Sequence, residues 1–141
     1  MKEVSVKKLK EKLENKLISG LAVDIDETIS DTSTYWFEEA IKKFGKPNNK
    51  TTKEIIEEYV LIQNIPFWNK LEIESWLLDA RRNLDFHSKP LPIIGALDTL
   101  KEIDKKIKIV AYITARPEFL RETTINWLEK HGFPKADLIH M

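Results

Sequence analysis

The sequence contains no cysteine. Disulfide bridges, thiolate nucleophiles and cysteine-ligated zinc are therefore excluded from its fold and its chemistry. Long apolar runs are also missing, because no stretch approaches the roughly 20 residues that a transmembrane helix needs. The N-terminal segment MKEVSVKKLKEKLENKL lacks the uninterrupted apolar region of a signal peptide. These absences favour a cytoplasmic protein that makes no contact with a membrane.

An excess of charge of one sign is missing as well. Lys plus Arg and Asp plus Glu each total 23 residues, so net charge gives no reason to expect nucleic acid as a partner. The hydrophobic share of 42% is typical of a folded globular protein. A length of 141 residues indicates one domain that carries at most a small insertion.

Short apolar segments alternate with helix-like segments at the two ends of the chain. Strands are predicted at 21–25, 107–113 and 136–140, and helices at 3–17, 95–104 and 117–131. In the last helix Pro117 is expected as the first residue and Gly132 as the C-cap. This order predicts an α/β fold, a Rossmann-like three-layer core around a parallel sheet. The apolar run at 21–25 is typical of a central strand covered on both faces.

The middle of the chain lacks strand-like segments. Helices are predicted at 34–44, from Thr51 or Thr52 through Leu61, and at 70–84. The segment Lys89-Pro90-Leu91-Pro92 is the clearest hinge. We therefore expect residues 1–30 and 91–141 to form the core, and residues 31–90 to form a small helical cap inserted into it.

Two aspartates follow the first predicted strand, in the segment Val23-Asp24-Ile25-Asp26-Glu27-Thr28. Open parallel sheets bind ligands at this end of their strands. One carboxylate of such a pair can attack phosphorus, while the other protonates the leaving oxygen and later activates water. Because two carboxylates repel a phosphate dianion, the arrangement calls for Mg²⁺, which prefers oxygen ligands. The alternative is an aspartate pair that only shapes a turn and caps a helix.

A second polar segment, Thr114-Ala115-Arg116, follows the second long predicted strand. The threonine hydroxyl, the backbone N–H groups and the guanidinium group are suited to holding a phosphate beside a helix N-terminus. Ordinary helix capping by the threonine is the competing interpretation. A phosphate-binding role is favoured because Asp24 is expected on the neighbouring strand.

The segments VDIDET and ITAR, in this order and separated by a helical stretch, resemble the haloacid dehalogenase (HAD) superfamily of phosphohydrolases. DIDETISDTSTYW followed by PFW is most similar to the class B and class C acid phosphatases and 5′(3′)-nucleotidases. The resemblance implies Asp24 as the nucleophile of an aspartyl-phosphate mechanism and Asp26 as general acid and base. It also implies Mg²⁺ bound by Asp24 and the Asp26 carbonyl, with Thr28 supporting the loop and Thr114 binding the phosphoryl group.

The family's lysine and its further aspartates are expected after the third strand, so the resemblance predicts an active site that is incomplete at Met141. Two functions stay open on this basis. One is a Mg²⁺-dependent phosphomonoester hydrolase, and the other is a domain that binds phosphate or a protein partner without turnover. The missing strands would also leave residues 21–25 at an exposed sheet edge, which predicts self-association.

Nine of the 13 aromatic residues lie in the expected cap. Aromatic faces that accept any base would suit a nucleoside monophosphate as the small phosphorylated substrate. A core role is favoured for Phe44, Trp76 and Phe86, since a small helical unit needs large side chains. At least one residue of Tyr35-Trp36-Phe37 is expected to face the ligand, and Phe67-Trp68 stays undecided.

Overall fold

The computed structural model describes residues 7–8, 10–11, 14–15 and 19–141. The chain divides into two compact units, Met1–Ser30 with Pro92–Met141, and Asp31–Leu91. The described residues between positions 7 and 15 are helical and exposed. The apolar positions of the helix expected at 3–17, Val6, Leu9, Leu13 and Leu17, lie outside the described residues.

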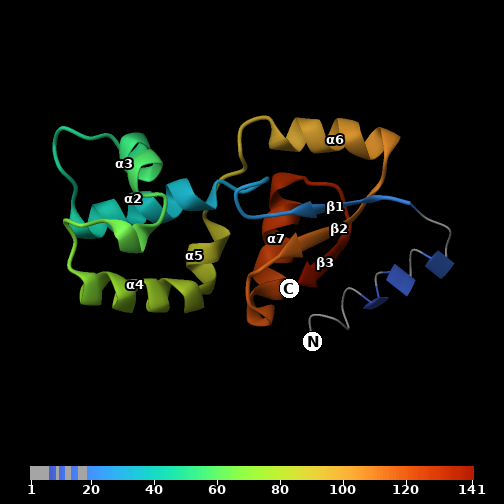
Figure 1. Cartoon of the computed structure of the whole chain (residues 1–141). Coiled ribbons are helices and arrows are strands. Elements are labelled where there is room, and N and C mark those ends of the chain that lie inside the picture. The colour runs from blue at the N-terminus through green and yellow to red at the C-terminus, as the bar shows by residue number, and fades with distance from the viewer. Residues whose placement is uncertain (1–6, 9, 12–13, 16–18) are drawn as a thin grey trace. The chain divides into compact units, whose positions relative to one another are not determined.

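The first unit contains three parallel strands, β1 (Leu21–Asp24), β2 (Ile109–Thr114) and β3 (Asp137–His140), which lie side by side in Figure 1. The sheet order is β1-β2-β3, so the central strand is β2. In the described residues the segment expected at 21–25 lies at the edge of the sheet, as predicted from the missing strands, and it is not covered on both faces. In the described part of the chain β1 pairs only with β2, and three of its four residues are exposed. The β2 segment IVAYIT is longer, and each of its residues is buried or half-buried.

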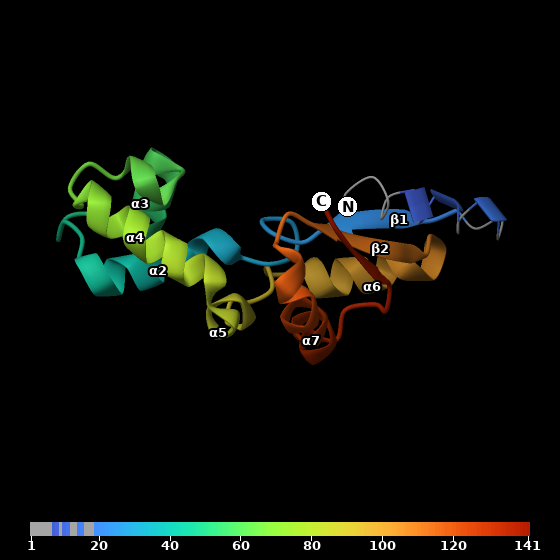
Figure 2. The same cartoon turned by 90° about the horizontal axis from the view of Figure 1, so that it is seen from below.

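Two helices connect the strands, α6 (Ala96–Lys106) and α7 (Arg121–His131). Both lie on the same side of the sheet, as Figure 2 shows, because right-handed connections between successive neighbouring strands require it. Their contact with the sheet buries Ile25, Tyr112, Trp127 and Phe133. Burial raises the pKa of Tyr112 to about 12, and its hydroxyl donates to the Pro134 carbonyl at 2.7 Å. The α/β class and the Rossmann-like parallel core are thus confirmed.

The sequence predicted the C-terminal end of α7 correctly but not its first residue. Gly132 ends the helix in the left-handed region at φ 78°, and its N–H bonds to the carbonyls of Leu128 and Glu129, which confirms the expected C-cap. Pro117 is not the first helical residue, because its ψ of 151° is extended. A short 3₁₀ helix, η2 (Glu118–Leu120), separates it from the start of α7.

The regular structure of the second unit is helical. Its elements are α2 (Thr32–Phe44), α3 (Thr52–Tyr59), the 3₁₀ helix η1 (Ile62–Asn64), α4 (Lys70–Arg82) and α5 (Leu84–Ser88). Thr51 caps α3 by accepting from the Glu54 N–H at 3.2 Å, while the Glu54 carboxylate accepts from the Thr51 N–H at 2.7 Å. The helix stops before Leu61 because Val60 takes a φ of 60°. Asn83 divides the helix expected at 70–84 by capping α5 through the Phe86 N–H.

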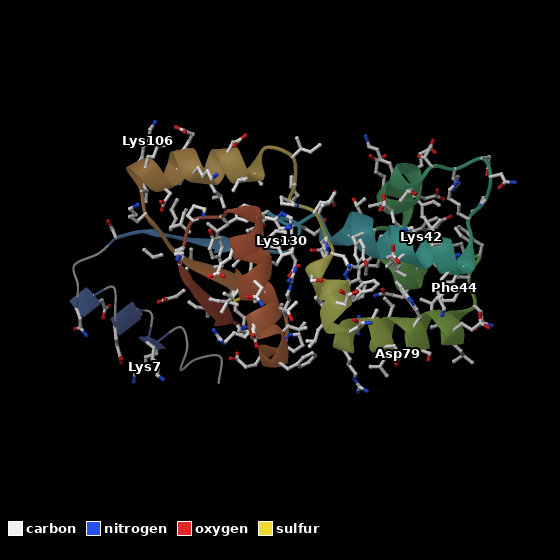
Figure 3. All side chains as sticks on the ribbon, turned by 180° about the vertical axis from the view of Figure 1, so that it is seen from behind. Lys7, Lys42, Phe44, Asp79, Lys106 and Lys130 are labelled. Atoms are coloured by element: carbon white, nitrogen blue, oxygen red, sulfur yellow. The ribbon has the colours of Figure 1, made fainter. Side chains whose placement is uncertain are left out.

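Large aromatic side chains build the interior of this unit. Figure 3 labels Phe44 at the end of α2, where its ring lies 5.8 Å from Trp68 and 6.0 Å from Trp76. The Trp68 indole N–H donates to the Gly45 carbonyl at 2.7 Å. Phe37 is 2% exposed, whereas Phe67 is 39% exposed. Most of the aromatic residues therefore supply packing, as expected for Phe44 and Trp76.

The chain leaves the first unit and re-enters it through two adjacent segments. Ser30 and Pro92 form an isolated antiparallel bridge, and the Ile93 N–H donates to the Ile29 carbonyl at 2.9 Å. On the other side of this bridge the Asp31 N–H donates to the Leu91 carbonyl at 2.8 Å. The predicted hinge at Lys89–Pro92 thus belongs to a paired, two-stranded connection.

Candidate active site

The loop after β1 is closed by hydrogen bonds to a single carbonyl group. The Ile25 carbonyl accepts from the N–H groups of Thr28, Ile29 and Ser30 at 3.3, 3.0 and 3.0 Å. Ile25 and Ile29 are 0% and 2% exposed, so the apolar side chains of VDIDETIS anchor the loop in the core. Asp24, the last residue of β1, stays exposed above it.

The tip of this loop has an unusual backbone conformation. Glu27 has a φ of 62°, and its N–H donates to the Ser30 carbonyl at 2.9 Å. A non-glycine residue in the left-handed region stores strain, which is common near functional sites. The next residue, Thr28, donates its hydroxyl to the Asp24 carboxylate at 3.3 Å. Thr28 therefore orients the carboxylate that was predicted to be the nucleophile.

The second polar segment lies beside the first. Asp24 is in register with Ile113, and the Ile25 N–H donates to the Ile113 carbonyl at 3.2 Å. Thr114, the last residue of β2, is 0% exposed, and Ala115 after it is exposed. The carboxyl ends of two neighbouring parallel strands thus bring Asp24 and Thr114 to one edge of the sheet.

Asp26 joins the two segments through its side chain. Its carboxylate accepts from the Thr114 hydroxyl at 3.3 Å and pairs with Arg116, whose Nη2 lies 2.7 Å from Oδ1. The Arg116 side chain is 4% exposed and that of Asp26 is 31% exposed. The guanidinium group of Arg116, which the sequence predicted to bind phosphate, therefore contacts the Asp26 carboxylate.

Two residues near this pair were missed at the level of the sequence. His140, in register with Thr114, is 8% exposed and donates from Nδ1 to the Arg116 carbonyl at 2.7 Å. Thr124 of α7 accepts from Arg116 Nη1 at 3.4 Å. The three histidines of the sequence, His87, His131 and His140, have no zinc-ligand spacing, so spacing alone gives His140 no role. Its position at the end of the third predicted strand was the signal that pointed to the same edge of the sheet.

The charges around the entrance of α7 are locally neutralised. A hydrogen bond from Arg121 holds the pKa of Glu118 below its usual range. Glu118 Oε2 also lies 3.8 Å from His140 Nε2. The α7 N-terminus is thus separated from Thr114 by η2 and flanked by an acidic side chain.

The donor atoms suited to a metal ion are few. In the part of the chain that the structure describes, no group of three or more His, Cys, Asp or Glu side chains forms a cluster that could hold one. The Asp24 carboxylate is exposed at the strand end and accepts a hydrogen bond from the Thr28 hydroxyl. Carboxylate and carbonyl oxygens fit Mg²⁺, which commonly keeps several waters and binds through one or two carboxylates and the substrate phosphate.

Comparison with known proteins places the chain in a family. The family model described as "5' nucleotidase, deoxy (Pyrimidine), cytosolic type C protein" matches residues 16–141. The chain belongs to this nucleotidase family. The predicted resemblance to HAD-superfamily phosphatases is therefore confirmed.

A curated Bacillus cereus protein named "Putative nucleotidase" is 31% identical to the chain over 119 residues. The match covers 79% of this chain and 58% of that protein, so the chain spans less than two thirds of the length of this relative. No solved structure matches the chain. None of the described helices is both long and apolar enough to cross a membrane.

Proposed function

We propose that this member of the nucleotidase family hydrolyses phosphate monoesters, with nucleoside monophosphates as the substrate class. The observation that carries the proposal is the alignment of the ends of β1 and β2. It brings Asp24 and Thr114 to one edge, and the Asp26 side chain contacts Thr114 at 3.3 Å. Two aspartates and a threonine thus lie where parallel sheets bind their ligands, which supports Asp24 as the proposed nucleophile, Asp26 as the proposed proton carrier and Thr114 as the proposed phosphate ligand.

Hydrolysis would proceed in two steps. A carboxylate oxygen of Asp24 attacks phosphorus, the ester P–O bond breaks, and Asp26 gives a proton to the leaving oxygen. Water then attacks the aspartyl phosphate while Asp26 takes its proton, and the Asp24–phosphate bond breaks to release phosphate. Thr114 and the backbone at Ala115 would hold the phosphoryl oxygens, and Thr28 would keep Asp24 oriented.

Mg²⁺ is the cofactor that we propose for this site. The Asp24 carboxylate and the Asp26 main-chain carbonyl would bind it, with water and substrate phosphate as the remaining ligands. When bound, the ion offsets the charge between the phosphate and the two carboxylates. The contacts of the Asp26 side chain with Arg116 leave the main-chain carbonyl as the proposed ligand of this residue.

The helical unit is the proposed source of substrate selectivity. We propose that residues 31–90 act as a cap and that the protein works in the cytoplasm. Phe67 is 39% exposed, and its ring lies 6.1 Å from that of Tyr59. These rings supply apolar faces on which a nucleobase could stack.

The test compares Asp24→Asn with the unaltered chain and with Asp79→Asn, an exposed aspartate of α4 that Figure 3 labels. Phosphate release from a nucleoside monophosphate is measured with Mg²⁺ and with a chelator. The unaltered chain and Asp79→Asn should release phosphate only with Mg²⁺. Asp24→Asn should release none, because the amide is isosteric but a poor nucleophile. Equal turnover by Asp24→Asn would refute the assignment. Phosphate binding without turnover by the unaltered chain would favour the non-catalytic alternative.

The free edge of β1 supports a further partner, a second copy of the chain. Within the described residues β1 pairs on one side only, and Leu21 is 38% exposed. Unpaired strand edges recruit other strands. We therefore propose self-association along Leu21–Asp24.

A further inference from the structure

Arg116 contacts both carboxylate oxygens of Asp26. Its Nη2 lies 2.7 Å from Oδ1, and its Nε lies 3.2 Å from both Oδ1 and Oδ2. A guanidinium group donates hydrogen bonds and accepts none. In this geometry Asp26 is therefore an acceptor at both oxygens, and its carboxylate plane is fixed.

Arg116 is itself held by three other elements. Its N–H donates to the Thr114 hydroxyl at 3.1 Å, and its carbonyl accepts from His140 Nδ1 at 2.7 Å. Its Nη1 donates to the Thr124 hydroxyl at 3.4 Å, and Thr124 is 0% exposed. The ends of β2 and β3 and the interior of α7 thus fix both the backbone and the guanidinium group of this arginine.

These contacts argue against a direct role of Arg116 on the substrate. Its side chain is only 4% exposed, and Nε and Nη2 both point to Asp26. An arginine that bound a phosphate oxygen would have to direct these atoms outward. The next residue, Pro117, has an extended ψ and directly precedes η2.

We propose that Arg116 is a positioning residue that holds Asp26 in its proton-accepting arrangement for the second step of the reaction. The inference rests on the proposed function. In that step the oxygen of water bonds to phosphorus, the Asp24–phosphate bond breaks, and one proton of the water passes to Asp26. Because Arg116 presents Asp26 as an acceptor, its loss should slow this step more than the transfer of the phosphoryl group to Asp24.

Kinetics separate the two steps. If only the second step is slowed, the phosphorylated chain accumulates, and kcat and KM fall together while kcat/KM is preserved. The substrates are p-nitrophenyl phosphate and a nucleoside monophosphate, with Mg²⁺ present. For Arg116→Met we expect kcat to fall by about 10- to 100-fold with both esters, within the range for lost acid–base catalysis. With p-nitrophenyl phosphate we also expect a burst of p-nitrophenolate close to one equivalent per chain.

Two further variants keep the test decisive. Arg116→Lys, which keeps the charge and loses the two-pronged contact, should give an intermediate kcat. Arg121→Met removes a neighbouring arginine that contacts Glu118 and the Leu138 carbonyl, and its kcat, kcat/KM and burst amplitude should equal those of the unaltered chain. If Arg116→Met does not fold, Thr124→Val removes one partner of Arg116 and should shift kcat in the same direction.

The outcomes distinguish this inference from the proposed function. If kcat and kcat/KM fell by the same factor in Arg116→Met and in Arg116→Lys, and neither variant gave a burst, the positioning role would be overturned. The proposed function would not be affected by this result. The same result for Thr124→Val would overturn the positioning role if neither arginine variant folds. Turnover by Asp24→Asn, or none by the unaltered chain with either ester, would overturn the proposed function and this inference with it.

Discussion

Removing either member of the Asp26–Arg116 pair should destabilise the first unit, and by unequal amounts. The Arg116 side chain is 4% exposed, whereas the Asp26 side chain is 31% exposed. Asp26→Asn leaves a guanidinium charge that water hardly reaches, and breaking a buried pair in this way costs roughly 3 kcal/mol. Arg116→Met keeps most of the side-chain volume and leaves a carboxylate that can take up water. Its expected cost is about 1–2 kcal/mol, close to that of lost hydrogen bonds to a charged group.

The assay must report the first unit alone, because two compact units need not unfold together. Native-state hydrogen exchange of the amides of Ile109–Thr114 meets this condition, since β2 is the buried centre of the sheet. Asp26→Asn, Arg116→Met and the double variant form a cycle. We expect the double variant to lose less free energy of unfolding than the sum of the losses in the two single variants, by about 2 kcal/mol. An Arg116→Met variant that is less stable than Asp26→Asn would refute the reasoning from burial.

Three other predictions concern the same unit. Gly20→Ala should destabilise the first unit by about 1–3 kcal/mol, because the new Cβ would lie 2.7 Å from the Lys108 carbonyl oxygen. The measurement is urea unfolding, and an unchanged midpoint would contradict the prediction. Because burial raises the pKa of Tyr112 from 10.0 to about 12, its contribution to stability should be complete below pH 10 and disappear as the pH rises through 12. In absorbance at 295 nm one late tyrosine titration should then accompany alkaline unfolding and be missing in Tyr112→Phe. For the β1 edge, light scattering at micromolar concentration should report a dimer or larger species, and a stable monomer with rapidly exchanging amides at Leu21–Asp24 would refute self-association.

Local signals in the sequence predicted much of the fold. The β2 segment was placed within two residues of its observed start, because six consecutive apolar or threonine residues follow a helix that ends in lysines. A threonine cap at position 51 or 52 and the stop at Gly132 were predicted because hydroxyl side chains and glycine satisfy helix ends in specific ways, and the structure has the cap at Thr51. The two polar segments were found because each directly follows an apolar strand.

The edge position of the first strand was predicted from the family resemblance, and the local signals alone did not give it. An apolar run of four or five residues is equally suited to the centre and to the edge of a sheet. Leu21–Asp24 has this pattern and lies at the edge in the described residues, whereas Asp137–His140, with charged and histidine ends, is mostly buried. Burial of a strand is decided by which helices and neighbours reach it, and these come from distant parts of the chain.

The role of Arg116 shows where such reasoning stops. Arg116 follows Thr114 by two positions in the sequence. It has the features of a phosphate ligand, since arginine and a free helix end are both suited to anions. Its actual partner, Asp26, is 90 residues away along the chain. Parallel pairing of β1 with β2 brings the two together, and the register that sets Asp24 opposite Ile113 determines that the loops after these strands meet. A sequence motif identifies the donors and acceptors of a site. Which donor bonds to which acceptor depends on the strand register. In the positioning role that we propose, Arg116 serves a carboxylate of the protein rather than the phosphate of the substrate.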